Sequence, residues 1–294
     1  MKPRSNNRRG RSNVVRFVLT GILCLFLAAC STTRFAYNQL DWIVVWYLNG
    51  YFSLDDAQEA ELREGVNRNL EWHRRNQLPK YAAFARQVDR DLAGPVTADL
   101  LEHRLEQAIE FWDAALNHML PDVSAFFLML SDEQIDEFVA NLEDNNQELW
   151  DDYAGETPEK RLKRRERAAF KGFKRVFGRL NDEQKALIGS YMVNMHDVSE
   201  YWIESRRRWQ RDFRALVIDR PAEPEFSERL MAMMLDPNRT DDPGYREKVE
   251  ANKRTFMEMT AALIGILTDK QRDRFSSKMN SFARDFETLS VQES

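Results

Sequence analysis

Cysteine is nearly absent from this 294-residue chain, which contains only Cys24 and Cys30. Everything after Cys30 is therefore a cysteine-free segment. Such a segment forms no disulfide, offers no thiolate nucleophile and builds no cysteine-based metal site. Its stability has to come from core packing, and a segment of this length can bury enough apolar surface for that.

Recognisable catalytic motifs are also missing. The four histidines, His73, His103, His118 and His196, never show the His-Glu-x-x-His spacing that places two zinc ligands on one helix face. No Gly-x-Ser-x-Gly elbow and no glycine-rich phosphate loop occurs. We therefore expect no enzyme, no cofactor and no metal. Carboxylates are abundant, so a hydrolase with two acidic residues acting on wall glycans or lipid stays an alternative, although most such clusters are solvated helix faces.

No stretch alternates apolar and polar residues, which is the pattern of a half-buried strand. Apolar residues instead recur at intervals of three and four, as in amphipathic helices; Leu62, Val66 and Leu70 are an example. The same spacing over residues 181–217 predicts one helix roughly 50 Å long. We predict an all-α fold, an elongated bundle of about nine helices without a β-sheet, formed by a single domain over residues 35–294.

Prolines should mark the ends of these helices, because proline lacks the amide hydrogen that a helix interior requires. They stand at positions 79, 95, 121, 158, 221, 224, 237 and 243.

The N-terminus has the organisation of an export signal. A basic segment between Lys2 and Arg16 precedes the apolar run Phe17–Ala29. That run is shorter than the roughly 20 residues needed to span a bilayer, which disfavours the alternative of a transmembrane anchor. Loss of residues 1–29 would change the formal charge from −5 to −11, because that segment carries six basic residues and no acidic one. The acidic remainder argues against a nucleic-acid partner.

The signal ends in Leu27-Ala28-Ala29-Cys30, which resembles the lipobox of bacterial lipoproteins. The resemblance implies that residues 1–29 are a signal peptide, and that Cys30 is lipidated and becomes the mature N-terminus. Residues 30–34 would then be the lipidated cysteine and a short tether to the membrane. Because Ser31 is not aspartate, the resemblance also implies sorting to the periplasmic face of the outer membrane, with the inner membrane as the alternative.

The segment Phe35–Phe52 is rich in aromatic residues, and it includes Phe35, Tyr37, Trp42, Trp46 and Tyr47. A helix that is apolar on all sides is either buried or in contact with lipid. One interpretation is an interfacial helix with its tryptophans and tyrosines at headgroup level. The other is a core helix, which we favour because the segment lacks the basic polar face of most interfacial helices.

Basic residues gather in two places, at residues 160–175 and 206–214. The first stretch contains a candidate patch for an anionic partner, formed by Arg161, Lys163, Arg164, Arg165 and Arg167. It could contact anionic lipid or an acidic protein. We favour the alternative that both stretches pair with the acidic runs of the same bundle, Asp55–Glu64 and Glu143–Asp152, which are of similar size.

One five-residue motif occurs four times, beginning at Leu54, Leu130, Leu180 and Leu267. In each copy a capping residue follows the leucine and a glutamine stands three positions further on. This spacing predicts a capping box at the start of four helices. The copies are unevenly spaced, which excludes a regular solenoid.

These boxes resemble the repeated motif of Spy-type periplasmic chaperones. A longer resemblance, to an uncharacterised all-α family of Gram-negative envelope lipoproteins, rests on several short segments besides the lipobox. They are Leu40-Asp41-Trp42, Trp72-His73-Arg74-Arg75, Leu78-Pro79-Lys80-Tyr81, Arg207-Arg208-Trp209, Asp242-Pro243-Gly244-Tyr245-Arg246 and Leu267-Thr268. This resemblance implies an all-α fold and a location in the cell envelope, and it supplies no catalytic residues.

The sequence thus favours a membrane-anchored, non-enzymatic interaction or accessory protein of the cell envelope, with an envelope protein as its partner. A chaperone-like holdase for exported proteins is the alternative. It is suggested by the glutamine boxes and by the methionine-rich stretch Met231–Met234, because methionine surfaces bind loosely.

Overall fold

The computed structural model describes residues 30–236 and 243–292, and all the regular structure in these two ranges is helical. The predicted all-α multi-helix bundle is confirmed there, with twelve α-helices and one π-helical turn, η1. The elements are α2 (Cys30–Tyr37), α3 (Leu40–Phe52), α4 (Asp56–Asn76), α5 (Leu78–Asp91), α6 (Ala98–Leu128), α7 (Asp132–Leu149), η1 (Trp150–Ala154), α8 (Pro158–Phe177), α9 (Asp182–Met192), α10 (Ser199–Asp219), α11 (Glu225–Leu235), α12 (Pro243–Gly265) and α13 (Asp269–Ser290).

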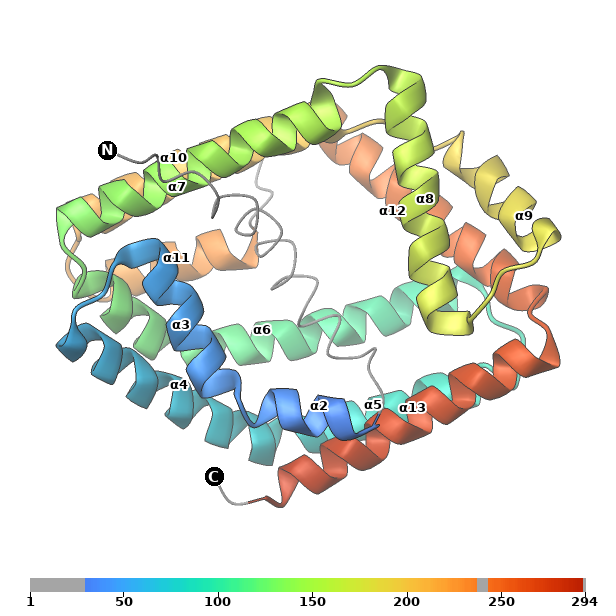
Figure 1. The fold of residues 1–294 in the computed structure, drawn as a ribbon, viewed down its shortest axis with the longest axis horizontal. Coiled ribbons are helices and arrows are strands. Elements are labelled where there is room, and N and C mark those ends of the chain that lie inside the picture. The colour runs from blue at the N-terminus through green and yellow to red at the C-terminus, as the bar shows by residue number, and fades with distance from the viewer. Residues whose placement is uncertain (1–29, 237–242, 293–294) are drawn as a thin grey trace, which may run out of the picture.

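The helices are arranged around a flat, four-sided frame (Figure 1). One side is the pair α7 and α10, and the side across from it contains α5 packed along α13. Helices α8, α9 and α12 form one end of the frame, and α3, α4 and α11 gather at the other. Helix α6 is the longest and connects the two ends, contacting α4 and α11 at one and α12 at the other.

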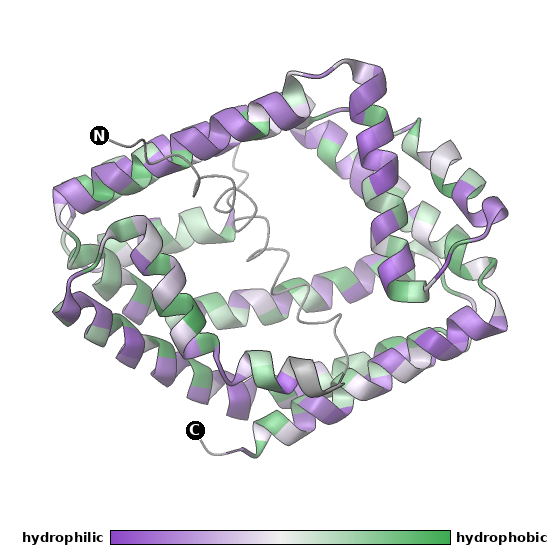
Figure 2. Ribbon diagram, in the orientation of Figure 1, coloured by the Kyte–Doolittle hydropathy of each residue, from purple (hydrophilic) through white to green (hydrophobic). Residues whose placement is uncertain are grey.

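Three separate clusters of buried side chains hold this frame together. One lies at the α3–α4–α11 end and centres on Phe52, Phe213 and Phe226. A second lies at the α8–α9–α12 end, and a third lies between α5 and α13. Figure 2 shows apolar and polar residues interleaved along most of the helices, as expected where one face of a helix is buried and the other is solvated.

All four predicted capping boxes are confirmed. The side chains of Asp55, Ser131, Asn181 and Thr268 each accept a hydrogen bond from the backbone amide three residues on, and the glutamine there bonds back to the amide of the cap. These bonds satisfy amide groups that a helix N-terminus would otherwise leave unpaired. The boxes therefore fix where α4, α7, α9 and α13 begin.

The predicted single helix over residues 181–217 is wrong. The chain leaves α9 at Met192 and re-enters a helix at Ser199. Asp197 causes the new start, because its carboxylate accepts hydrogen bonds from the backbone amide of Ser199 at 3.1 Å and from its hydroxyl at 2.8 Å. Such local bonds compete with a continuous helix.

One other expectation also needs correction. Pro121 was expected at a helix end but lies inside α6, which continues to Leu128. A tertiary contact supports this stretch, because the neighbouring Asp122 accepts hydrogen bonds from Arg68 and Asn69 of α4. Residues 30–34, the expected tether, form the beginning of α2.

Candidate functional site

The aromatic segment after Cys30 presents two faces, and the outward one consists of large exposed rings. Phe35 in α2 is 69% exposed, and Trp42 and Trp46 in α3 are 54% and 59% exposed. The two tryptophans lie one turn apart and stack, with ring centroids 6.0 Å apart. We call these two rings, together with the exposed Phe35 of the preceding helix, the aromatic face. A surface of this kind marks a contact with a membrane or a partner.

The opposite face of the same segment belongs to the core. Val45 and Phe52 are buried, and the buried Tyr37 hydroxyl lies 2.8 Å from the Nδ1 atom of His73. Tyr47 is half-buried and its hydroxyl donates to that of Tyr51 at 3.5 Å. Helices α2 and α3 therefore carry both core and exposed aromatic side chains.

The predicted basic patch on α8 divides into inward and outward members. Arg161 binds Asp197 at 2.5 Å and Glu200 at 3.4 Å. Arg164 binds Glu156 at 2.5 Å, and Arg165 donates to the carbonyl of His196 at 3.0 Å. The partners of these three arginines lie outside both acidic runs, so the expected pairing of this stretch with Asp55–Glu64 or Glu143–Asp152 is wrong.

The outward members of α8 form a line of cations, the α8 stripe. It comprises Lys160, Lys163, Arg167, Lys171 and Lys174. At 100° per residue these positions lie within about 80° of one another around the helix axis, and they extend over about 21 Å. Over residues 30–236 and 243–292, no ion pair or side-chain hydrogen bond involves any of the five. The stripe is a concentrated positive surface on an acidic protein.

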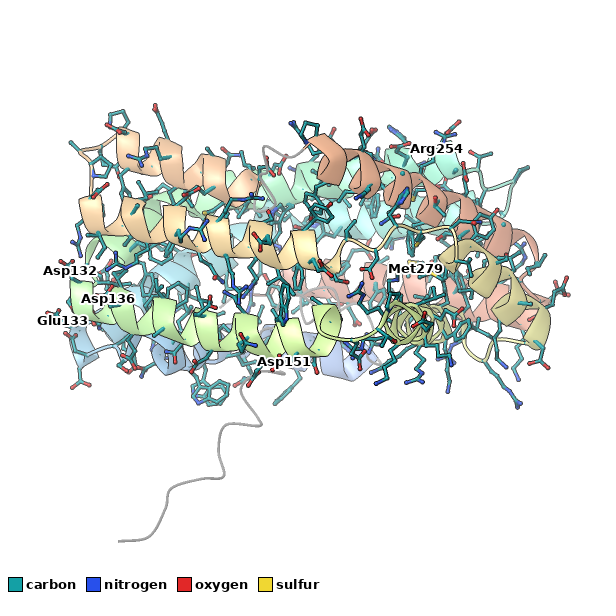
Figure 3. All side chains as sticks on the ribbon, turned by 90° about the horizontal axis from the view of Figure 1, so that it is seen from above. Asp132, Glu133, Asp136, Asp151, Arg254 and Met279 are labelled. Carbon is teal, nitrogen blue, oxygen red and sulfur yellow. The ribbon has the colours of Figure 1, made fainter. Side chains whose placement is uncertain are left out.

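The second basic stretch does pair within the bundle. In α10, Arg207 binds Glu143 at 3.0 Å, within the acidic run of α7, and Arg214 binds Asp136 at 2.7 Å. Asp136 lies towards the outer end of α7 (Figure 3). The predicted pairing with an acidic run is confirmed for Arg207, whereas Arg214 pairs with an acid of the same helix that lies outside the run.

Two hollows lie side by side where η1 meets α8. The first, of about 250 Å³, is lined by Lys160, Lys163, Arg164, Arg167 and one acid, Glu156. We call it the basic hollow. Glu156 forms an ion pair with Arg164, so the two lysines and Arg167 make the electrostatic potential in the basic hollow positive.

The second hollow, the aromatic hollow, has a volume of about 320 Å³. Its walls are mainly apolar and include Tyr153, Met195, Val198 and Trp202, with Arg165 at its edge. The guanidinium of Arg164, which lines the basic hollow, lies 4.9 Å from the ring centroid of Tyr153, which lines the aromatic hollow. The linings of the two hollows therefore touch at this stacked pair.

The loop between α9 and α10 forms one wall of the aromatic hollow and is fixed by polar contacts. His196 donates through its backbone amide to Asn252 at 2.8 Å and accepts at its carbonyl from the Asn252 side chain at 3.0 Å. Two guanidinium nitrogens at this corner, Arg164 Nη1 and Arg165 Nε, are buried without a hydrogen-bond partner among the described residues. Buried donors of this kind cost free energy until an acceptor reaches them.

The four histidines lie in separate places. Burial lowers the pKa of His73 to about 4, so it is neutral at pH 7. The imidazole of His118 stacks on Trp72, with centroids 3.9 Å apart, and His103 and His196 are exposed. No group of three or more histidine, cysteine or acidic side chains is placed to hold a metal ion within the described part of the chain.

The glutamines of the capping boxes bond to one another in two pairs. The side-chain amides of Gln58 and Gln134 exchange hydrogen bonds of 3.0 and 2.7 Å. Those of Gln184 and Gln271 exchange bonds of 2.7 and 2.9 Å. Each glutamine also donates to the carbonyl just before its partner's leucine. The boxes are thus internal junctions between helix ends.

The methionine-rich stretch is likewise used internally. Met233 and Met234 pack against the cluster around Phe213, and the indole of Trp209 donates to the carbonyl of Met233 at 2.9 Å. Two methionines of this stretch therefore contribute to the core.

The aromatic face and the α8 stripe belong to helices on one side of the frame. Helix α8 lies in front of α12 in Figure 1, and α2 and α3 are also on the near side. Figure 3, turned by 90°, agrees, because α7 and α8 lie along the same edge of the molecule and α10 lies further from that edge than α7.

The signal peptide and the side chain of Cys30 lie outside the described residues. No helix in the described ranges has the length and apolar character needed to cross a bilayer.

Sequence comparison connects this geometry to a family. No curated protein and no solved structure matches the chain significantly. The model of a family of unknown function, DUF6279, matches residues 50–246, which is well over half of the chain and includes η1, α8 and every residue that lines the two hollows except Asn252. The protein is therefore a member of this family of unknown function, DUF6279.

Proposed function

We propose that this protein is a lipid-anchored protein of the cell envelope that acts without catalysis, as an accessory or interaction protein at the membrane surface. In this proposal residues 1–29 are removed, Cys30 carries the lipid, and the folded part lies on the periplasmic face of the outer membrane. Its partner is an envelope protein.

The observation that supports the proposal is the aromatic face. Phe35, Trp42 and Trp46 begin five residues after Cys30, and all three are more than half exposed. Tryptophan is enriched at the interface between lipid headgroups and acyl chains. One lipid chain alone gives marginal, reversible attachment, and stable attachment takes a second signal. The aromatic face supplies that signal next to the anchor.

Membrane fractionation of cells that produce three forms of the protein tests the attachment. We expect the parent form in the membrane fraction and Cys30→Ser in the soluble fraction. Combined Phe35→Ser, Trp42→Ser and Trp46→Ser should keep the lipid but wash off at high salt or in carbonate. Trp112→Ser is the matched control, since Trp112 is 43% exposed and belongs to α6 instead of the aromatic segment, and it should behave like the parent.

Crosslinking in intact cells tests the accessory role. We expect the parent protein to capture a small, reproducible set of envelope proteins that Cys30→Ser no longer captures. Capture of many unfolded exported proteins, equally by both forms, would instead support the holdase. Turnover of a wall, lipid or protein substrate by the purified protein would refute the proposal of a non-enzymatic role.

A further inference from the structure

We propose that the corner between η1 and α8 is a binding site for an anionic amphiphile, a lipid with a phosphate headgroup and one acyl chain. The phosphate would lie in the basic hollow and the acyl chain in the aromatic hollow. This inference goes beyond the proposed attachment, because binding here involves neither Cys30 nor the aromatic face.

The basic hollow has the charge and the donors that a phosphate needs. Lys160, Lys163 and Arg167 converge on it, and none of the three takes part in an ion pair among the described residues. The one acid in the lining, Glu156, is neutralised by Arg164 at 2.5 Å. Phosphate oxygens form short, strong hydrogen bonds with lysine and arginine, so this lining selects an anion.

The aromatic hollow has the size and the walls for an apolar chain. Its volume of about 320 Å³ is within the range of small-molecule sites, and Tyr153, Val198 and Trp202 give it mainly apolar walls. A phosphate by itself would leave this space unused, and a neutral lipid would leave the three cations of the basic hollow unpaired.

The connection between the hollows favours one ligand over two. Arg164 lines the basic hollow and stacks on Tyr153, which lines the aromatic hollow, so a headgroup in one space and its chain in the other would meet at this pair. Two unpartnered nitrogens belong to these linings, Arg164 Nη1 to that of the basic hollow and Arg165 Nε to that of the aromatic hollow. An anionic group next to them would supply the acceptors that they lack.

The α8 stripe supplies a matched control within one helix. Lys163 and Arg167 line the basic hollow, whereas Lys171 and Lys174 continue the stripe outside it. Lys163→Gln with Arg167→Gln and Lys171→Gln with Lys174→Gln remove the same charge from the same face. The aromatic hollow offers a similar comparison. Val198→Trp fills it, and Val193→Trp changes the same loop at a position that is 64% exposed.

The experiment is native mass spectrometry of the full chain in a neutral detergent with three probes. Lysophosphatidylglycerol carries the anion and the chain, lysophosphatidylcholine has a neutral headgroup overall, and glycerol phosphate has no chain. We expect one molecule of lysophosphatidylglycerol to be retained and neither of the others. The pair Lys163→Gln with Arg167→Gln should lower the apparent affinity at least about tenfold, and Val198→Trp should abolish retention, while both controls bind as the parent does.

Four results would overturn the proposal. Lack of lysophosphatidylglycerol retention would do so directly. If the two double variants on α8 lost affinity for lysophosphatidylglycerol equally, binding would be a general attraction to the α8 stripe instead of a site. Equal retention of glycerol phosphate would leave an anion site with no role for the aromatic hollow. Equal retention of lysophosphatidylcholine would mean apolar adsorption without headgroup recognition. Retention by Cys30→Ser separates this site from the anchor, so the two proposals can fail independently.

Discussion

Gln184 and Gln271 are 87 residues apart in the chain, yet each side-chain amide both donates to and accepts from the other inside the protein. Gln184 has no exposed surface and Gln271 has 6%. Each residue also closes the capping box of its own helix. One pair of side chains thus joins the starts of α9 and α13 and satisfies the polar groups of both.

Replacing Gln184 by leucine should therefore destabilise the protein. The amide of Gln271 would lose its buried partner, and an unsatisfied buried polar group costs about 1–3 kcal/mol. We expect the free energy of unfolding, measured by urea denaturation, to fall by that amount. Gln58→Leu is the matched control, because Gln58 makes the equivalent bonds at the half-buried junction with Gln134 and water can replace them there.

The double variant Gln184→Leu with Gln271→Leu should be less destabilised than the sum of the two single variants. Removing both partners leaves no orphaned amide, so the two losses overlap. Simple additivity in this double-mutant cycle would show that the two glutamines do not act as one unit.

His73 should make stability depend on pH between about 6.5 and 4. Burial lowers its pKa to about 4, whereas the unfolded chain has the ordinary value of 6.5. Within this interval the unfolded state binds a proton that the folded state does not, so stability falls as the pH is lowered, by up to about 3 kcal/mol. Urea denaturation of the parent and His73→Gln across this interval measures the effect. The parent should lose more stability than the variant, and parallel curves would contradict the assignment.

Asp197 should stabilise the α9–α10 turn most at neutral pH. Burial raises the pKa of its carboxyl, but the hydrogen bonds of Ser199 and the charges of Arg161 and Arg165 outweigh burial and leave the pKa below its usual value. The carboxylate therefore stabilises the fold above about pH 4, and this contribution disappears as acid protonates it. We expect Asp197→Asn to lower stability by about 1–3 kcal/mol at pH 7. The difference from the parent should shrink in acid, and an equal loss at every pH would refute this explanation.

The contact between α5 and α13 should depend on Phe282, which is 2% exposed in the cluster between these helices. Truncating a buried phenylalanine costs about 3–5 kcal/mol, so Phe282→Ala should lower the thermal midpoint strongly. Phe35→Ala is the control, because this ring is mostly exposed and its loss should change stability by less than about 0.5 kcal/mol. Calorimetry of both variants makes the comparison, and a small effect of Phe282→Ala would mean that this contact is not essential.

The sequence predicted local features well because local physics determines them. A leucine, a capping residue and a glutamine three positions on are sufficient to begin a helix, and all four helices begin there. The break after Met192 also had a local signal that the apolar spacing obscured. Aspartate bonds readily to the backbone amide two residues on, and Asp197 makes this bond to Ser199 just before α10, whose N-cap is Val198.

Long-range features could not be predicted from the sequence because they depend on which helices pack against each other. Nothing near Gln58 specifies Gln134 as its partner, since the pairing follows from the packing of α3, α4, α6 and α7. The charge pattern of α8 was visible, but Asp197 and Glu156 decide which arginines turn inward. The aromatic hollow combines η1, α10 and the loop before α10, and its tryptophan, Trp202, looked in the sequence like one more residue of a helical apolar stripe.

Helix α13 closes one side of the frame by packing along α5. It covers an apolar strip on α5, Leu78, Ala82 and Ala85, that is synthesised almost 200 residues before it. Until α13 packs there the strip on α5 is uncovered, and an uncovered apolar strip of this kind associates with other chains. A chain in which α13 has not yet formed is therefore exposed to aggregation during the interval that separates the synthesis of α5 from that of α13.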